Sequence, residues 1–243
     1  MCTLTYRLTT QGYQLFFNRD EQRTRPQAMP PAIDKTLQSA YPIDPSGGGT
    51  WIAVHQSGIS LALLNYYQAQ VKPGLKTFIS RGVIIPKLLA NNGNIHNALL
   101  NMDLSVFQAF KLCVFDRDLS AKKGQATQYI WNGEELAFST LKVLDSQPIT
   151  SSSVDFETVY AYRKQQFNNM INNQATIVDY LAYHQHQGES GKCSVKMFRE
   201  DAQTVSFTQI SVDQKQKLGQ KVNIEYLDYL IPQPLNATAR LIL

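Results

Sequence analysis

The alternation of hydrophobic and polar side chains at the start of the chain predicts a β-hairpin. Residues 2–8 alternate as in a half-buried strand, and residues 13–18 form a second β-prone run. Gln11 and Gly12, between them, are typical turn residues. In such a hairpin the end of the second strand returns beside the start of the first. We therefore expect the side chains that follow position 18 to lie next to position 2.

The rest of the pattern predicts a run of strands, then helices, then strands again. Further strands are expected at residues 50–55, 59–66, 109–116, 127–131, 136–141, 193–199, 204–212 and 221–230. Helices are expected at residues 75–89, 155–168 and 175–187. The segment 25–49, rich in Pro, Ser and Gly, is interpreted as a long connecting loop. Separate runs of strands and helices favour an α+β class over alternating βαβ units.

Length and composition favour one globular domain over residues 1–243. A chain of 243 residues can bury a sizeable core, and 43% hydrophobic with 17% charged residues is not a disordered composition. The net charge of +4 is spread along the chain without a Lys/Arg tract, so no nucleic-acid partner is expected. No apolar run reaches the ~18 residues of a membrane span. These features leave the oligomeric state open.

The three cysteines, Cys2, Cys113 and Cys193, are an odd set without the spacing of metal ligands. Since no basic and apolar leader precedes Cys2 either, we expect a reducing compartment and a cytoplasmic protein. Cys113 lies in an apolar run and is predicted to be an inert buried thiol. Cys193 is predicted to be structural as well, and burial is expected to protect both thiols from reaction.

Cys2 directly follows Met1, so removal of Met1 would place a nucleophile and a base on one residue. A thiolate attacks carbonyl carbon, and a free α-amino group of pKa ~8 takes or returns the proton without a histidine. Arg19 beside Cys2 would favour the thiolate, and the Asp20 carboxylate would hold the amine in position. The alternative is that Arg19, Asp20 and Glu21 form a solvated turn after a strand.

Four motifs in order along residues 1 to about 70 carry a resemblance to a known family. They are Met1-Cys2-Thr3, Asn18-Arg19-Asp20-Glu21, Gly48-Gly49-Thr50-Trp51-Ile52-Ala53 and Leu64-Asn65-Tyr66. On these motifs the chain resembles the NRDE family, also called the transport and Golgi organisation 2 family. The resemblance implies a distant relationship to the choloylglycine hydrolases and penicillin acylases. It also implies their α+β fold, the four-layer αββα sandwich of the Ntn hydrolases, which use an N-terminal nucleophile.

Carried over position by position, the resemblance makes Cys2 the nucleophile, Arg19 its electrostatic partner and Asp20 the orienting carboxylate. It makes Asn65 an oxyanion-hole donor. Residues 59–64 are apolar enough to form a core strand that delivers Asn65 to its end. An asparagine in an ordinary turn is the alternative interpretation of that position.

Trp51 and Tyr66 are expected to line the substrate pocket, although both would also suit a core position. In the hydrolase relatives a second asparagine and an arginine from the C-terminal third complete the pocket. The segments expected to correspond here are residues 150–153, which include Ser151 to Ser153, and residues 191–194. In the latter, Lys192 keeps the positive charge without the planar fork of arginine and is assigned to substrate binding. These departures leave open whether activity is retained.

The sequence thus predicts an Ntn-type cysteine amidohydrolase or acyltransferase that acts on a linear amide or acyl substrate through Cys2 and needs no cofactor. A non-enzymatic protein that handles haem or another hydrophobic ligand on the same fold is the alternative. A protein of this fold without a small-molecule role is a third. No metal is expected: His184 and His186 flank Gln185, but no third ligand is placed, and they are predicted to form a solvated helix end.

Overall fold

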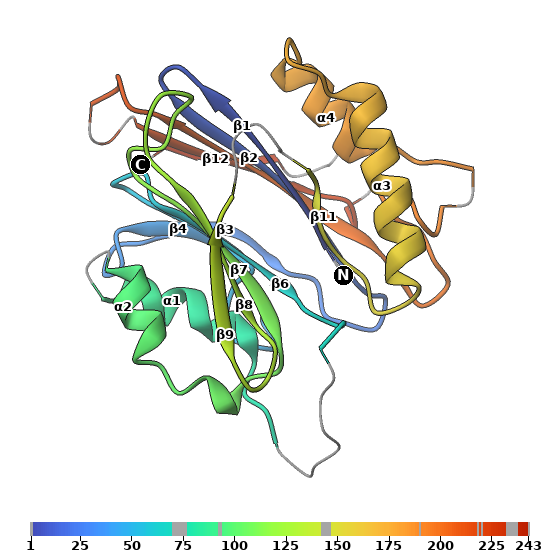
Figure 1. Ribbon diagram of the computed structural model, residues 1–243, viewed down its shortest axis with the longest axis horizontal. Coiled ribbons are helices and arrows are strands. Elements are labelled where there is room, and N and C mark those ends of the chain that lie inside the picture. The colour runs from blue at the N-terminus through green and yellow to red at the C-terminus, as the bar shows by residue number, and fades with distance from the viewer. Residues whose placement is uncertain are drawn as a thin grey trace.

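The computed structural model describes residues 2–69, 77–91, 94–141, 147–189, 191–217, 219, 221–231 and 238–242, with residues 238–241 described by their backbone alone. Two antiparallel sheets pack face to face, and helices cover the outer face of each sheet (Figure 1). The order of layers is therefore helix, sheet, sheet, helix. The αββα sandwich implied by the family resemblance is confirmed.

In the described residues the first sheet has the strand order β10, β1, β2, β11, β12, β13. Its strands are β1 (Cys2–Thr9), β2 (Gly12–Gln22), β10 (Ile149–Ser151), β11 (Ala202–Asp213), β12 (Val222–Asp228) and β13 (Thr238–Ile242). The helices α3 (Phe156–Met170) and α4 (Ile177–Gln185) cover its outer face (Figure 1).

The second sheet has the order β3 to β9 without interruption. Its strands are β3 (Met29–Asp34), β4 (Ser39–Ile43), β5 (Ile52–His55), β6 (Ser60–Asn65), β7 (Phe110–Phe115), β8 (Ala126–Trp131) and β9 (Leu136–Thr140). Its outer face is covered by the 3-10 helices η1 (Arg81–Val83) and η2 (Leu104–Val106) together with α1 (Ile84–Leu89) and α2 (Ile95–Leu100).

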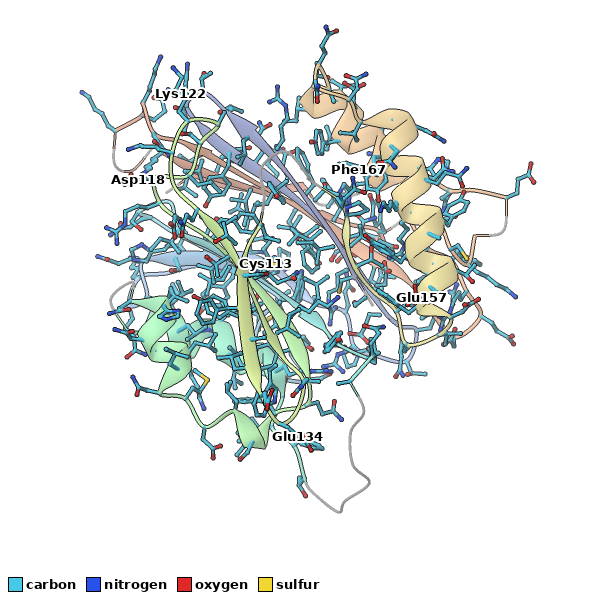
Figure 2. All side chains as sticks on the ribbon, in the orientation of Figure 1. Cys113, Asp118, Lys122, Glu134, Glu157 and Phe167 are labelled. Carbon is cyan, nitrogen blue, oxygen red and sulfur yellow. The ribbon has the colours of Figure 1, made fainter. Side chains whose placement is uncertain are left out.

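Three hydrophobic cores separate the four layers. Leu4 and Phe17 of the first sheet pack in the middle core with Cys113 of the second, and Figure 2 shows Cys113 in the interior of the molecule. On the other face of the first sheet, Phe16 packs with Phe167 of α3. Adjacent side chains of β2 thus enter different cores, because successive strand residues point to opposite faces of a sheet. This alternation determines which side chains meet at the end of the hairpin.

The prediction of a loop over residues 25–49 is wrong, because this segment contains β3 and β4. β3 is an edge strand with mostly exposed side chains, and it includes Pro30 and Pro31. Proline is tolerated at a sheet edge, where its missing N–H has no ladder partner to lose. The composition of residues 25–49 therefore indicated a loop, although the segment includes the edge strand of the second sheet.

The predicted strand at residues 193–199 is also wrong. The segment consists of bends with one isolated bridge, between Phe198 and Gln203. The carbonyls of Cys193 and Ser194 accept hydrogen bonds from the Arg163 side chain instead of from a neighbouring strand.

The predicted helix at residues 75–89 is observed only from Arg81 onward, and residues 75 and 76 lie outside the described part of the chain. The short elements α2, β10 and β13 were not predicted. Within the described residues, no helix combines the length and apolar character needed to cross a bilayer.

Candidate active site

The β1–β2 hairpin places Arg19 directly opposite Cys2 in the strand register, as the sequence predicted. On the other side of β1, Ser151 of β10 is also in register with Cys2. Directly opposed residues of an antiparallel pair point to the same face of the sheet. Cys2, Arg19 and Ser151 therefore project toward the facing sheet, while the side chains of Thr3 and Asp20 belong to the face under the helices.

A cavity of about 350 Å³ opens at this end of the sandwich, between the two sheets and η1. Five of the seven predicted site residues line it: Cys2, Arg19, Asp20, Trp51 and Asn65. The charged residues among those that line it are Arg19, Asp20, Glu21, Arg25, Asp44 and Arg81. The lining is thus dominated by charged and polar groups.

Cys2 keeps partial exposure toward this cavity. Protein atoms surround the thiol on its other sides, and this burial raises the pKa of Cys2 above its usual value. The negative charge of Asp20 raises that pKa as well. The Asp20 backbone N–H and the Arg19 charge lower it, but burial is the largest effect. Arg19 favours the thiolate as expected, yet it does not suffice to hold Cys2 as a resting thiolate.

Arg19 is buried and lies in a network of charges and an aromatic ring. Its Nη2 is 3.1 Å from Glu21 Oε2 and 3.4 Å from Asp44 Oδ2. Its guanidinium carbon lies 4.3 Å from the centre of the Trp51 ring. Trp51 belongs both to the middle core and to the cavity wall. These contacts hold the Arg19 guanidinium in the wall of the cavity.

Asp20 is bound from the helix layer. Its carboxylate accepts hydrogen bonds from Thr204 Oγ1 at 2.6 Å and from Arg163 Nη2 at 3.2 Å. Arg163, from α3, also donates to Thr3 Oγ1 at 2.6 Å and is fully buried. The charge–charge contact with Asp20 keeps both ions paired inside the protein.

Sequence reasoning missed Arg163. The resemblance implied an arginine from the C-terminal third, and residues 191–194 were expected to correspond to it. The guanidinium that reaches Asp20 comes from α3 instead. An arginine in an amphipathic helix gives no signal for burial, since arginine is usually exposed.

Asn65 ends β6 and faces the cavity from the second sheet. Its Nδ2 donates to the hydroxyl of Tyr67 at 2.7 Å. A side-chain amide carries two N–H groups, so a second donor remains. Burial raises the pKa of Tyr67, which keeps that hydroxyl protonated at neutral pH.

Tyr66 and Lys192 do not line the cavity. The Tyr66 ring lies 5.1 Å from Lys111 Nζ, and Tyr67 takes the place in the cavity wall that was predicted for Tyr66. Lys192 is exposed in the bend that follows Gly191. Their assignment to substrate binding stays a prediction that the cavity geometry does not support.

His184 is buried, which contradicts the predicted solvated helix end. Asn18 Nδ2 donates to two carbonyls, so Asn18 Oδ1 is the acceptor that faces His184 Nδ1 at 3.2 Å. His184 Nε2 therefore accepts from Thr5 Oγ1, at 2.8 Å. Burial lowers the pKa of His184 to about 3, so the ring is neutral. Within the described residues, no group of three or more His, Cys, Asp or Glu side chains is arranged to hold a metal ion.

Comparisons with known proteins identify the family and the fold of the chain. The family model described as Transport and Golgi organisation 2 matches residues 1–229. No curated protein sequence matches the chain. Among solved structures, the N-acylethanolamine-hydrolyzing acid amidase orthologue of Caenorhabditis elegans aligns with TM-score 0.58 at 11% identity, covering 91% of this chain and 98% of its own.

Two bacterial hydrolases align as well. Penicillin V acylase from Agrobacterium tumefaciens gives TM-score 0.51 at 12% identity, with 95% of this chain and 84% of that chain covered. A mutant of the conjugated bile acid hydrolase from Clostridium perfringens gives TM-score 0.53 at 13% identity, with 100% and 92% covered. Likenesses at such low identity establish the fold. The chain thus has the fold of the Ntn hydrolases and belongs to the Transport and Golgi organisation 2 family.

Proposed function

We propose that this protein is an N-terminal cysteine amidohydrolase or acyltransferase that acts on a linear amide or acyl substrate. The observation that carries the proposal is the position of Cys2. Its thiol opens into a polar cavity, with Arg19 in register beside it and Asn65 contributed by the facing sheet. The fold, shared with proteins named as acylase, hydrolase and amidase, supports the same proposal.

In the first step the α-amine of Cys2 takes the thiol proton, once Met1, which lies outside the described residues, has been removed. A base is needed because burial keeps the resting thiol protonated. The sulfur electron pair attacks the carbonyl carbon, and the carbonyl π electrons move onto oxygen. The second N–H of Asn65 and a backbone N–H stabilise this oxyanion, and one such donor commonly contributes ~3 kcal/mol.

The intermediate collapses when the C–N bond breaks and the leaving amine receives the proton from the α-ammonium group. A thioester remains on Cys2. Water then attacks the thioester carbonyl carbon and gives a proton to the α-amine. The C–S bond breaks, a carboxylic acid leaves, and the α-ammonium group returns that proton to the Cys2 sulfur. An acceptor amine in place of water gives acyl transfer by the same steps. Asp20, fixed by Arg163 and Thr204, orients the α-amino group through both steps.

Mass spectrometry tests the proposal. The intact mass establishes whether Met1 is absent, and incubation with a panel of N-acyl amides should release free amine and leave an acid-trapped acyl adduct on Cys2. Cys2→Ala should abolish both signals. The matched variant Cys193→Ala should keep both, since Cys193 does not line the cavity. A folded protein that retains Met1, or that gives neither amine nor adduct across the panel, contradicts the proposal.

A further inference from the structure

Two arginines and two carboxylates of the cavity balance one another. Arg25 Nη2 and Nε lie 2.5 and 3.1 Å from Asp44 Oδ2, and its Nε lies 3.5 Å from Glu21 Oε2. Arg19 binds the same two carboxylates. This network has no net charge. The remaining carboxylate of the lining, Asp20, is bound by a guanidinium of the helix layer, as described above.

Arg81 also lines the cavity, in addition to Arg19 and Arg25. Within the described residues it forms no ion pair. Its Nη1 donates to the carbonyl of Ala109 at 3.0 Å. A guanidinium has five N–H donors, so most of this fork has no acceptor in the described structure. Burial lowers the pKa of Arg81, and so does the Arg25 charge, whereas Tyr67, Cys2 and Glu21 act electrostatically in the opposite direction. Glu21 is bound by Arg19 and Arg25, so among the described residues Arg81 has no carboxylate partner of its own close to Cys2.

The backbone around Arg81 is held firmly. Ser80 Oγ accepts from the Gly82 N–H at 3.3 Å, and Gly82 O accepts from the Thr50 N–H at 3.0 Å. A Cβ at Gly49 would lie 2.2 Å from the carbonyl carbon of Gly82, so this close approach requires glycine. The start of η1 is thus joined to the segment that leads into β5. A guanidinium on such a support is preorganised for a ligand.

We propose that Arg81 binds a carboxylate of the substrate, which makes the substrate class amides that carry a carboxylate near the scissile bond, such as N-acyl amino acids. This inference rests on the proposed function of Cys2. The planar fork of a guanidinium matches a carboxylate in a bidentate geometry, and a partly desolvated cation gains more from such a partner than an exposed one. A neutral substrate would leave the Arg81 charge without a partner inside the cavity.

A binding experiment separates this inference from catalysis. The Cys2→Ala protein is titrated by NMR with N-hexanoylglycine and with N-hexanoylglycinamide, which differ in the carboxylate alone. We expect the carboxylate probe to bind about 10- to 100-fold more tightly, the range of a charged hydrogen bond. Adding Arg81→Gln should bring the two affinities to within about twofold. Adding Arg23→Gln, the same change on an exposed arginine outside the cavity lining, should leave the preference intact.

Equal affinities in Cys2→Ala, no binding of the carboxylate probe at millimolar concentration, or a full preference in the Arg81→Gln background each overturns the inference. If Arg81→Gln does not fold, Arg81→Lys is measured in its place. Lysine keeps the positive charge but lacks the planar guanidinium, so this variant should lose most of the preference for the carboxylate probe. Release of amine by the unmodified protein reports on the proposed function separately. If the unmodified protein releases amine but Cys2→Ala shows no preference for the carboxylate probe, the role of Arg81 in binding is wrong and the proposed function stands. If Cys2→Ala prefers the carboxylate probe but the unmodified protein releases no amine, the proposed function is wrong and the carboxylate site stands.

Discussion

The guanidinium of Arg163 lies 3.2 Å from the carboxylate of Asp20, and both side chains are buried. The two residues are 143 positions apart and come from α3 and β2. Their contact joins the helix layer to the strand that places Arg19 beside Cys2. The stability of the fold and the order of the candidate site therefore depend on the same ion pair.

Replacing Arg163 by methionine should destabilise the protein strongly. The substitution keeps side-chain length but leaves the Asp20 carboxylate buried without its partner, which costs about 3–5 kcal/mol of unfolding free energy. Urea denaturation measures the change. Gln165→Ala, exposed on the same helix, is the control and should stay within about 0.5 kcal/mol. A loss below about 1 kcal/mol for Arg163→Met would show that the pair does not hold the layers together.

His184 should make the protein less stable as pH falls. The unfolded imidazole takes up a proton near its ordinary pKa of 6.5, whereas the folded ring stays neutral down to about pH 3. Its contribution is therefore complete above pH 6.5 and is lost at ~1.4 kcal/mol per pH unit below it. Between pH 7.5 and 5 the loss should be about 2 kcal/mol.

Denaturation curves of the wild type and of His184→Gln at pH 7.5 and pH 5 isolate the contribution of His184 to the unfolding free energy. The variant should lose less stability than the wild type on acidification. His96→Gln, in the opposite helix layer, should behave as the wild type does. Parallel pH dependence of the wild type and His184→Gln would show that the buried ring does not control acid sensitivity.

Cys2 should react slowly with iodoacetamide at neutral pH and faster as pH rises, because burial raises the pKa of its thiol. Arg19→Ala should slow the reaction further at each pH, since Arg19 favours the thiolate. Cys113 should stay unlabelled, because it is buried and its thiol pKa is raised to about 12. Cys193 is partly exposed, which contradicts the expectation that burial protects it.

Peptide mass spectrometry over a pH series measures the three labelling rates. The control for Arg19→Ala is an unchanged melting temperature, since loss of the Arg19 network could loosen the hairpin. A Cys2 rate that does not respond to Arg19 would mean that the charged network is structural and does not act on the thiol.

Asn65→Ala should lower kcat by about 10²–10³ with little change in KM, if the Asn65 amide acts on the oxyanion. Tyr67→Phe removes only the acceptor of the Asn65 hydrogen bond and should have a smaller effect. Asn168→Ala, exposed on α3, is the matched control. Equal losses in kcat and in affinity for a product analogue would indicate a binding role for Asn65 instead.

Haem titration separates the hydrolase from the ligand-handling alternative. For a Cys2 hydrolase we expect no Soret shift that depends on the Cys2 thiol. Absorption spectra of the wild type and Cys2→Ala with equimolar haem provide the measurement. A saturable shift that disappears in Cys2→Ala would favour haem handling through this residue.

The sequence by itself determined the hairpin and hence the pairing of Cys2 with Arg19. Alternating side chains and a tight turn admit one register, because a shift by one residue would move every apolar side chain to the wrong face. The same local pattern, an apolar run ending in a polar residue, was enough to place Asn65 at the end of a core strand. The ordered motifs of the first 70 residues then pointed to the family and its fold.

The tertiary structure alone decided which distant charges meet. A helical pattern shows that one face of α3 is buried, but it does not show that Arg163 lies under Asp20 on β2. The segment 25–49 had the composition of a loop, and only its place at a sheet edge explains its strands. Arg81 reaches the cavity because Gly49 and Gly82 allow two backbones to touch. Such contacts depend on how whole layers pack, which no local spacing of residues encodes.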